Sequence, residues 1–228
     1  MSKRIQTLIA CLFFITTAPC FAQFKKDRSV FRFGVRAVNV YGDNVPFGDN
    51  VKIKPVIDLG FGINYRLSKN LSFQPEIHYS PRGFKSTYRR TALDSTYTDN
   101  SLELHYLDIC PNLNYVFGNR DSFGTQLCVW AGPYLGVGIT GRNVYSGVRL
   151  SERRRADSTF SNTVRTFGNG LNRIDYGFNM GVGIQVEKFT QVGISYSVGL
   201  NNVADDRNFS YYNQSIGLFV KVLFDDLF

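Results

Sequence analysis

The stretch Glu76-Ile-His78-Tyr-Ser80 holds three residue types of hydrolase chemistry at even spacing. A serine hydroxyl becomes a nucleophile when a histidine base lies within hydrogen-bond reach and a third group orients that base. Alternate residues of a strand share one face, so these three side chains would lie together. The same spacing also fits a histidine that simply donates a hydrogen bond to a neighbouring carboxylate inside the protein, which is the interpretation we favour.

Two further patterns are weaker indications of a functional site. His105, with Glu103 and Asp108 nearby, is too sparse a set for a metal site. The glycines of GPYLGVG (residues 132–138) are similar to a phosphate loop, but they lie inside an alternating segment and no helix follows. The sequence therefore predicts no cofactor, no metal and no enzymatic activity.

The composition is that of strands and tight turns. Among 228 residues there are 20 Phe, 13 Tyr and 1 Trp, with 21 Gly against 7 Pro. With 43% apolar and 19% charged residues, a disordered chain is excluded. The mean hydropathy of -0.15 excludes a bundle of membrane helices, each of which needs about 20 apolar residues. Strands that span a membrane alternate in polarity, so the same value permits a membrane β-barrel.

The chain begins with an export signal. A basic start is followed by an apolar run at 8–15 and by small residues at 18–22. This pattern predicts a signal peptide over residues 1–22 and a single domain over 23–228. Lipid attachment at Cys20 is the alternative, and the preceding proline fits it poorly. Cleavage would lower the net charge from +8 to +6.

Hydrophobic alternation with a period of two predicts the rest of the chain as strands, with no helix. In the fourth segment the phase slips between Tyr106 and Leu107, which predicts a β-bulge there. The eight predicted strands cover residues 31–40, 55–66, 70–82, 101–117, 123–140, 173–187, 190–200 and 209–224.

The two faces of these strands differ, and so do their connections. One face is large and apolar, whereas the other is polar and collects the glycines, as a narrow curved interior would require. The connections alternate between about 2–5 and about 8–32 residues, as the periplasmic turns and outer loops of bacterial barrels do. We therefore predict an all-β fold, an eight-stranded antiparallel up-and-down transmembrane β-barrel in the outer membrane of a Gram-negative bacterium.

The predicted interior contains a neutral set of charges. Five cations face five acids, which favours a paired, filled lumen over an ion-selective pore, because unpaired buried charge is costly. A water-filled channel is the alternative. Trp130 also falls on the inner face. The predicted polar network comprises Arg32, Arg36, Asp58, Arg66, Glu76, His78, Arg82, Asp108, Asp175, Glu187 and Lys221.

Two cysteines remain after the signal peptide. If Phe117 pairs near Phe123 across a short turn, paired residue numbers sum to about 240, and those of Cys110 and Cys128 sum to 238. This predicts that the two thiols lie close together. They form either a disulfide, which an oxidising compartment permits, or two small buried thiols.

The segment 141–172 is predicted as a long, basic outer loop. Its arginines outnumber its acids by four, and the guanidinium group suits lipopolysaccharide phosphates. Solvated charge without a partner is the simpler alternative, and nucleic acid is not expected outside a cell. The arginines are Arg142, Arg149, Arg153, Arg154, Arg155 and Arg165.

Several stretches resemble the Bacteroidetes outer-membrane β-barrel family that includes the PorT-like proteins. The resemblance implies outer-membrane lipid as surroundings, insertion by the barrel-assembly machinery, and a link to type IX protein secretion. It assigns no catalytic residues. The matching stretches are LSFQPEIHYS (71–80), RGFK (82–85), LHYLDICPNL (104–113), RIDYGFNMGVG (173–183), YSVGLNN (196–202) and the last-strand signal SIGLFVKV (215–222).

The function expected from these observations is a structural or interaction role in the outer membrane. The resemblance to PorT-like proteins further suggests that the protein is an accessory of protein secretion. A small porin is the alternative. A lipid-modifying barrel enzyme is the third possibility, but the phasing turns His78 and Ser80 inward, away from lipid.

Overall fold

The computed structural model describes residues 26–41, 51–90, 96–118, 124–149, 158–168, 170–204 and 210–224, and the predicted signal peptide at 1–22 lies outside them. Within these ranges, no helix is long and apolar enough to cross a membrane. The strands are β1 (Lys26–Tyr41), β2 (Val51–Lys52), β3 (Lys54–Arg66), β4 (Leu71–Arg90), β5 (Thr96–Val116), β6 (Thr125–Arg149), β7 (Ser158–Arg165), β8 (Ile174–Val186), β9 (Thr190–Gly199) and β10 (Tyr212–Phe224).

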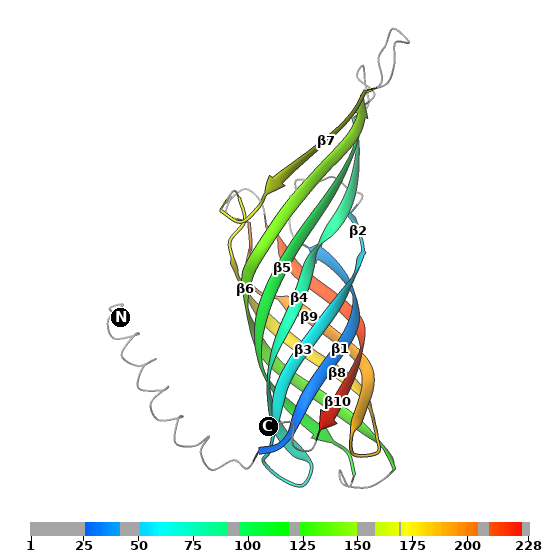
Figure 1. Ribbon diagram of the computed structural model, residues 1–228, viewed down its shortest axis with the longest axis vertical. Helices are drawn as coiled ribbons and strands as arrows, with labels where there is room; N and C mark the ends of the chain where they lie inside the picture. Colours follow the sequence, from blue (N-terminus) through cyan, green and yellow to red (C-terminus); the bar gives the residue numbers. More distant parts are fainter. Residues whose placement is uncertain are drawn as a thin grey trace, which may run out of the picture.

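Eight of the strands pair into a closed antiparallel ring, in the order β1-β3-β4-β5-β6-β8-β9-β10 and back to β1 (Figure 1). These eight correspond to the eight predicted segments. The predicted count is nevertheless wrong, because the described residues contain ten strands. The short strands β2 and β7 were expected as loop; they pair with β4 and β6 and widen the sheet.

The two ends of the ring differ. Short connections join β3 to β4, β5 to β6 and β8 to β9 at one end, which we call the turn end. At the opposite end β4, β5 and β6 continue far beyond the ring and β7 lies along β6 (Figure 1). We call this projecting sheet, with β2, the blade. The loop expected at 141–172 is therefore largely a hairpin of β6 and β7.

Burial alternates without a slip along β5: every even-numbered residue from Asn100 to Val116 is buried. The bulge expected between Tyr106 and Leu107 is wrong. Tyr106 and Leu107 are both apolar and were therefore expected on the outer face. Tyr106 in fact points inward, because the interior changes from polar to apolar at this level. The register shift lies on β6, where His105 pairs with Thr140 but Tyr106 pairs with Gly138.

The glycine-rich face is the inner face, and the glycines make room for large inner side chains. A Cβ atom at Gly181 would lie 2.4 Å from Nε1 of Trp130, and one at Gly60 would lie 2.7 Å from Cδ2 of His78. Real Cβ atoms do not approach so closely, so the filling of the interior depends on these glycines.

The outer face of the ring is a continuous band of large apolar side chains. Strands that cross a lipid bilayer present such a band, because the hydrocarbon offers no hydrogen-bond partners. Exposed members on the eight ring strands include Phe31, Phe33, Ile57, Phe61, Ile77, Leu107, Ile109, Leu135, Val137, Tyr176, Phe178, Val182, Ile194 and Leu218.

Candidate functional site: the filled interior and its apolar cap

The centre of the interior is an ion pair between strands on different sides of the ring. The Lys221 ammonium lies 2.6 Å from Oε1 of Glu76, and both side chains are completely buried. The second oxygen of Glu76 is 2.8 Å from Nε2 of His78, and the Asn112 amide donates to the first. A buried carboxylate with this many donors is fully compensated.

A second cluster shares one carboxylate between two arginines. Arg36 forms two hydrogen bonds of 3.0 Å with the two oxygens of Asp58, and Nε of Arg32 lies 3.2 Å from Oδ2. The Arg32 guanidinium stacks 4.9 Å from the ring centroids of both Trp130 and Phe219. The two aromatic rings therefore fill the space beside this guanidinium and interact with its charge.

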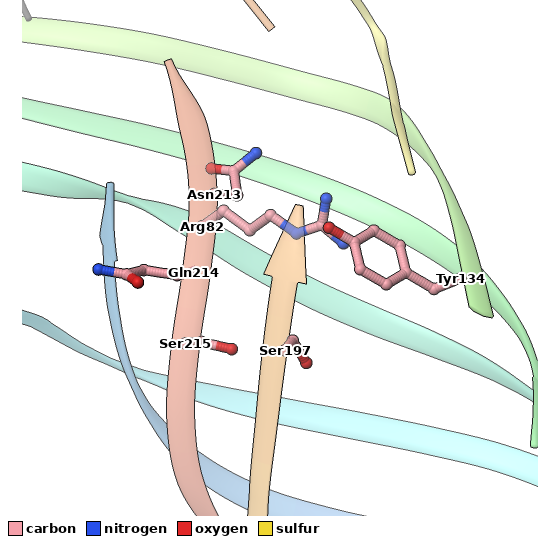
Figure 2. A pocket seen from close by; sticks show the side chains of 6 residues that line it. All are labelled: Arg82, Tyr134, Ser197, Asn213, Gln214 and Ser215. Carbon is pink, nitrogen blue, oxygen red and sulfur yellow. The ribbon is translucent and has the colours of Figure 1, made fainter. Parts of the chain in front are cut away.

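A third cluster lies towards the blade. Arg82 bridges Asp108 and Asp175. Its guanidinium lies beside the ring of Tyr134 (Figure 2), 4.7 Å from the ring centroid. The Asn213 amide donates to Asp175 at 2.7 Å. The cavity beside these groups measures only about 10 Å³, room for a single water molecule.

Above the Arg82 cluster the interior becomes apolar. Phe84 and Tyr211 lie with their rings 5.9 Å apart, and Phe167 packs edge-on against Tyr106 at 5.6 Å. We call this cluster the apolar cap. Its buried members are Val40, Phe84, Leu102, Leu104, Tyr106, Val203 and Tyr211, with Phe167, Leu171 and Ala204 packed against them.

Nine of the eleven predicted network residues lie in these buried clusters. The exceptions are Arg66 and Glu187, both at the turn end. Arg66 pairs with Asp27 and its side chain is 35% exposed, whereas Glu187 is exposed in the β8–β9 turn with φ of 52°. Strand ends leave the ring before their last residues can point inward, so the inner set is four cations against four acids.

Sequence reasoning missed the neutral members of the network. Gln74, Asn112, Tyr134 and Asn213 complete the hydrogen bonds of the charged groups. Their place on the polar face of alternating strands is the signal that could have identified them.

The hydrolase arrangement is not assembled. His78 contacts Glu76, but the Ser80 hydroxyl accepts a hydrogen bond from Arg36 at 3.2 Å. Both side chains are buried in the interior, away from the outer face. Among the residues that the structure describes, no group of three His, Cys, Asp or Glu side chains could hold a metal ion.

The two cysteines are buried free thiols. The expected proximity is wrong because the β5–β6 register differs from the assumed one. Cys128 pairs with Val116, six residues along β5 from Cys110, which corresponds to about 20 Å. Instead, the Asn179 amide donates to the Cys110 sulfur at 3.2 Å.

The predicted basic residues spread over strands and undescribed chain. Arg142 and Arg165 are paired in register on β6 and β7. Nε of Arg142 lies 2.6 Å from Oε2 of Glu103, and the Lys54 ammonium lies 2.8 Å from Oε1 of the same carboxylate. Arg149 ends β6, but its side chain is outside the described part, as are Arg153, Arg154 and Arg155.

This chain is similar to several solved structures, all at low sequence identity. The solved structures similar to this chain include Neisserial surface protein A, at 12% identity and a TM-score of 0.43, covering 86% of this chain and 97% of that chain. Ail of Yersinia pestis matches at 11% identity and a TM-score of 0.42, covering 88% and 100%. The N-terminal β-barrel domain of Pseudomonas aeruginosa OprF matches at 13% and 0.34, covering 88% and 100%.

No curated protein matches the sequence. Residues 21–205 match the sequence model of the family described as outer membrane protein beta-barrel domain. That match covers most of the chain, so the protein belongs to the outer membrane protein beta-barrel domain family and is a protein of the outer membrane.

Proposed function

We propose that this protein is a closed, non-enzymatic scaffold of the outer membrane that presents its blade at the cell surface as an interaction element. The observation that carries the proposal is the apolar cap above three layers of paired charge. A ring of eight strands is narrow enough for side chains to fill, and here ion pairs, amides and aromatic rings occupy it.

The orientation follows from the lengths of the connections. Barrels of the bacterial outer membrane place short turns in the periplasm and long hairpins outside the cell. By this rule the turn end faces the periplasm, and the blade of β4, β5, β6 and β7 faces outward. Its partners are then outer-leaflet lipid, lipopolysaccharide and surface proteins, after insertion by the barrel-assembly machinery.

Conductance tests the closed interior. The full mature chain, reconstituted in planar bilayers, should give no steady unitary conductance, because ion pairs, amides and aromatic rings fill the described part of the interior below the apolar cap. A general porin incorporated in the same bilayers is the positive control. Regular conductance steps from this protein would contradict the proposal and support the porin alternative.

A role as an accessory of type IX-like secretion rests on the sequence resemblance to PorT-like proteins. Deletion of the gene in its host, followed by comparison of the secreted proteome with the parent strain, tests that role. Loss of cargo that a plasmid copy restores would support it. An unchanged secretome would contradict it and leave the scaffold proposal standing on its own test.

A further inference from the structure

A groove lies on the outer face of the blade, where β2, β4, β5 and β6 run side by side. Its volume is about 400 Å³, within the range of small-ligand sites. Most of its lining side chains lie on one face of the sheet, because they sit at alternate positions of paired strands. The outward lining residues are Lys52, Lys85, Asp99, Ser101, Glu103, Val144 and Ser146.

Two lysines face each other at this groove. Lys52 of β2 pairs in register with Lys85 of β4, and both side chains are exposed. Neither has an ion-pair partner among the described residues. Directly opposed like charges destabilise a strand pair, so an anion between the two ammonium groups would relieve their repulsion.

The remaining charges of the groove favour an anion as well. Glu103 is already compensated, since it pairs with both Lys54 and Arg142 at its border. With Asp99 the local set comprises four cations and two acids. Ser101 pairs with both Lys85 and Val144 in the same row across the sheet and supplies a hydroxyl beside the lysines.

The groove lies beyond the end of the apolar band. On β4 the last large exposed residue of the band is Tyr79, and Lys85 follows six residues later, about 20 Å along the strand. A strand tilted by about 45° places that lysine roughly 14 Å beyond the band. This is the height of headgroups and sugars rather than of acyl chains.

We propose that this groove binds the phosphorylated saccharide of an outer-leaflet glycolipid, with a phosphate between Lys52 and Lys85 and sugar hydroxyls against Ser101 and Ser146. The inference deepens the proposed function and rests on its outward placement of the blade. Its height above the lipid-facing band, at the level of headgroups and sugars, favours a lipid-borne saccharide over a soluble one.

The test is binding of purified lipopolysaccharide to the full mature chain in detergent micelles. The Lys52→Gln/Lys85→Gln variant should bind at least about tenfold more weakly, because two charge-assisted contacts are lost. Lys69→Gln/Lys188→Gln removes the same charge at the turn end and should bind within about twofold of the parent. Dephosphorylated lipopolysaccharide should bind the parent as weakly as intact lipopolysaccharide binds the groove variant.

Equal binding by the parent and the groove variant would overturn the proposal, as would equal binding of the dephosphorylated lipid. Glucose 1-phosphate that bound as tightly as lipopolysaccharide would contradict the lipid source. Heat-dependent gel migration checks that each variant is folded, and Lys85→Glu, which reverses one charge, should weaken binding more than Lys85→Gln. Labelling of Lys85→Cys on intact cells tests the orientation separately from binding by purified protein.

Discussion

Lys221 and Glu76 meet at 2.6 Å although their strands are not neighbours: β1 and β3 lie between β10 and β4 in the ring. Both side chains are completely buried. The contact therefore crosses the interior, and it ties two walls of the ring that no backbone hydrogen bond joins. Glu76 also gathers His78 and Asn112, so one carboxylate connects several inner side chains.

Glu76→Gln should destabilise the protein strongly. It leaves the Lys221 ammonium buried without its counter-charge, which typically costs about 3–5 kcal/mol in the free energy of unfolding. Glu76→Leu combined with Lys221→Met removes both charges and should recover part of the loss, although His78 and Asn112 still lose their acceptor. Urea unfolding in micelles, followed by the fluorescence of Trp130, measures both, since this single tryptophan is buried beside Lys221. A double variant as unstable as the single one would contradict this account.

Gly83→Ala should disturb the start of the blade. Gly83 has φ of +123°, and a Cβ atom there would lie 2.2 Å from the Leu102 carbonyl oxygen. Gly118 has φ of +109° but nothing closer than 3.7 Å, so Gly118→Ala isolates the backbone strain, about 1–2 kcal/mol. Gly83→Ala should lower the free energy of unfolding by clearly more in the same urea experiment. Equal losses in the two variants would show that the close approach is unimportant.

The mature chain should contain two titratable thiols and no disulfide. Cys110 and Cys128 are both buried and lie about 20 Å apart along their strands. Denatured, unreduced protein should therefore react with two equivalents of a thiol reagent, whereas the folded protein should react slowly. Recovery of fewer than two thiols without reductant would contradict the β5–β6 register.

Acid should slightly lower the free energy of unfolding of the protein through Glu103 of the blade. The hydrogen bond from Lys54, with that from Arg142, lowers the pKa of Glu103, although partial burial opposes the shift. A carboxyl with a lowered folded pKa stabilises fully above its unfolded value of about 4.3 and loses that contribution as the pH falls through the folded pKa.

The parent should thus lose up to about 1 kcal/mol relative to Glu103→Gln between pH 6 and pH 3, the range for an exposed ion pair. Urea unfolding of both proteins at the two pH values measures it. If the Glu103→Gln variant lost as much unfolding free energy between pH 6 and pH 3 as the parent does, the acid sensitivity would belong to other groups.

Much of the ring was predictable from alternation. Period-two polarity identified all eight ring strands, and the glycine-rich face correctly indicated the inner side. Trp130 falls inside, at 3% exposure, as the phasing predicted. Alternation succeeds because each strand residue must choose between an apolar exterior and a packed interior.

The failures arise because the sequence pattern shows only the polarity of each residue. Polarity does not always indicate which way a side chain points, and it does not fix how two strands pair. Leu102, Leu104 and Tyr106 are apolar yet point inward, so the apolar cap was mistaken for a bulge. Register was equally hidden. A shift of four in the paired sum placed Cys128 opposite Val116, far from Cys110. Strand β2 has only two residues and β7 is mostly polar, so both resemble loop in the sequence, and only pairing with a neighbour reveals them.

The length of β6 sets a distance. Its 25 residues extend for about 80 Å, whereas a tilted strand crosses a bilayer in about 9–11 residues. About half of β6 therefore stands clear of the hydrocarbon, and beyond the ring it pairs with β5 on one edge and β7 on the other. A molecule bound at the outer end of β6 would therefore be held at a fixed height above the bilayer, because a paired strand is stiffer than a flexible loop.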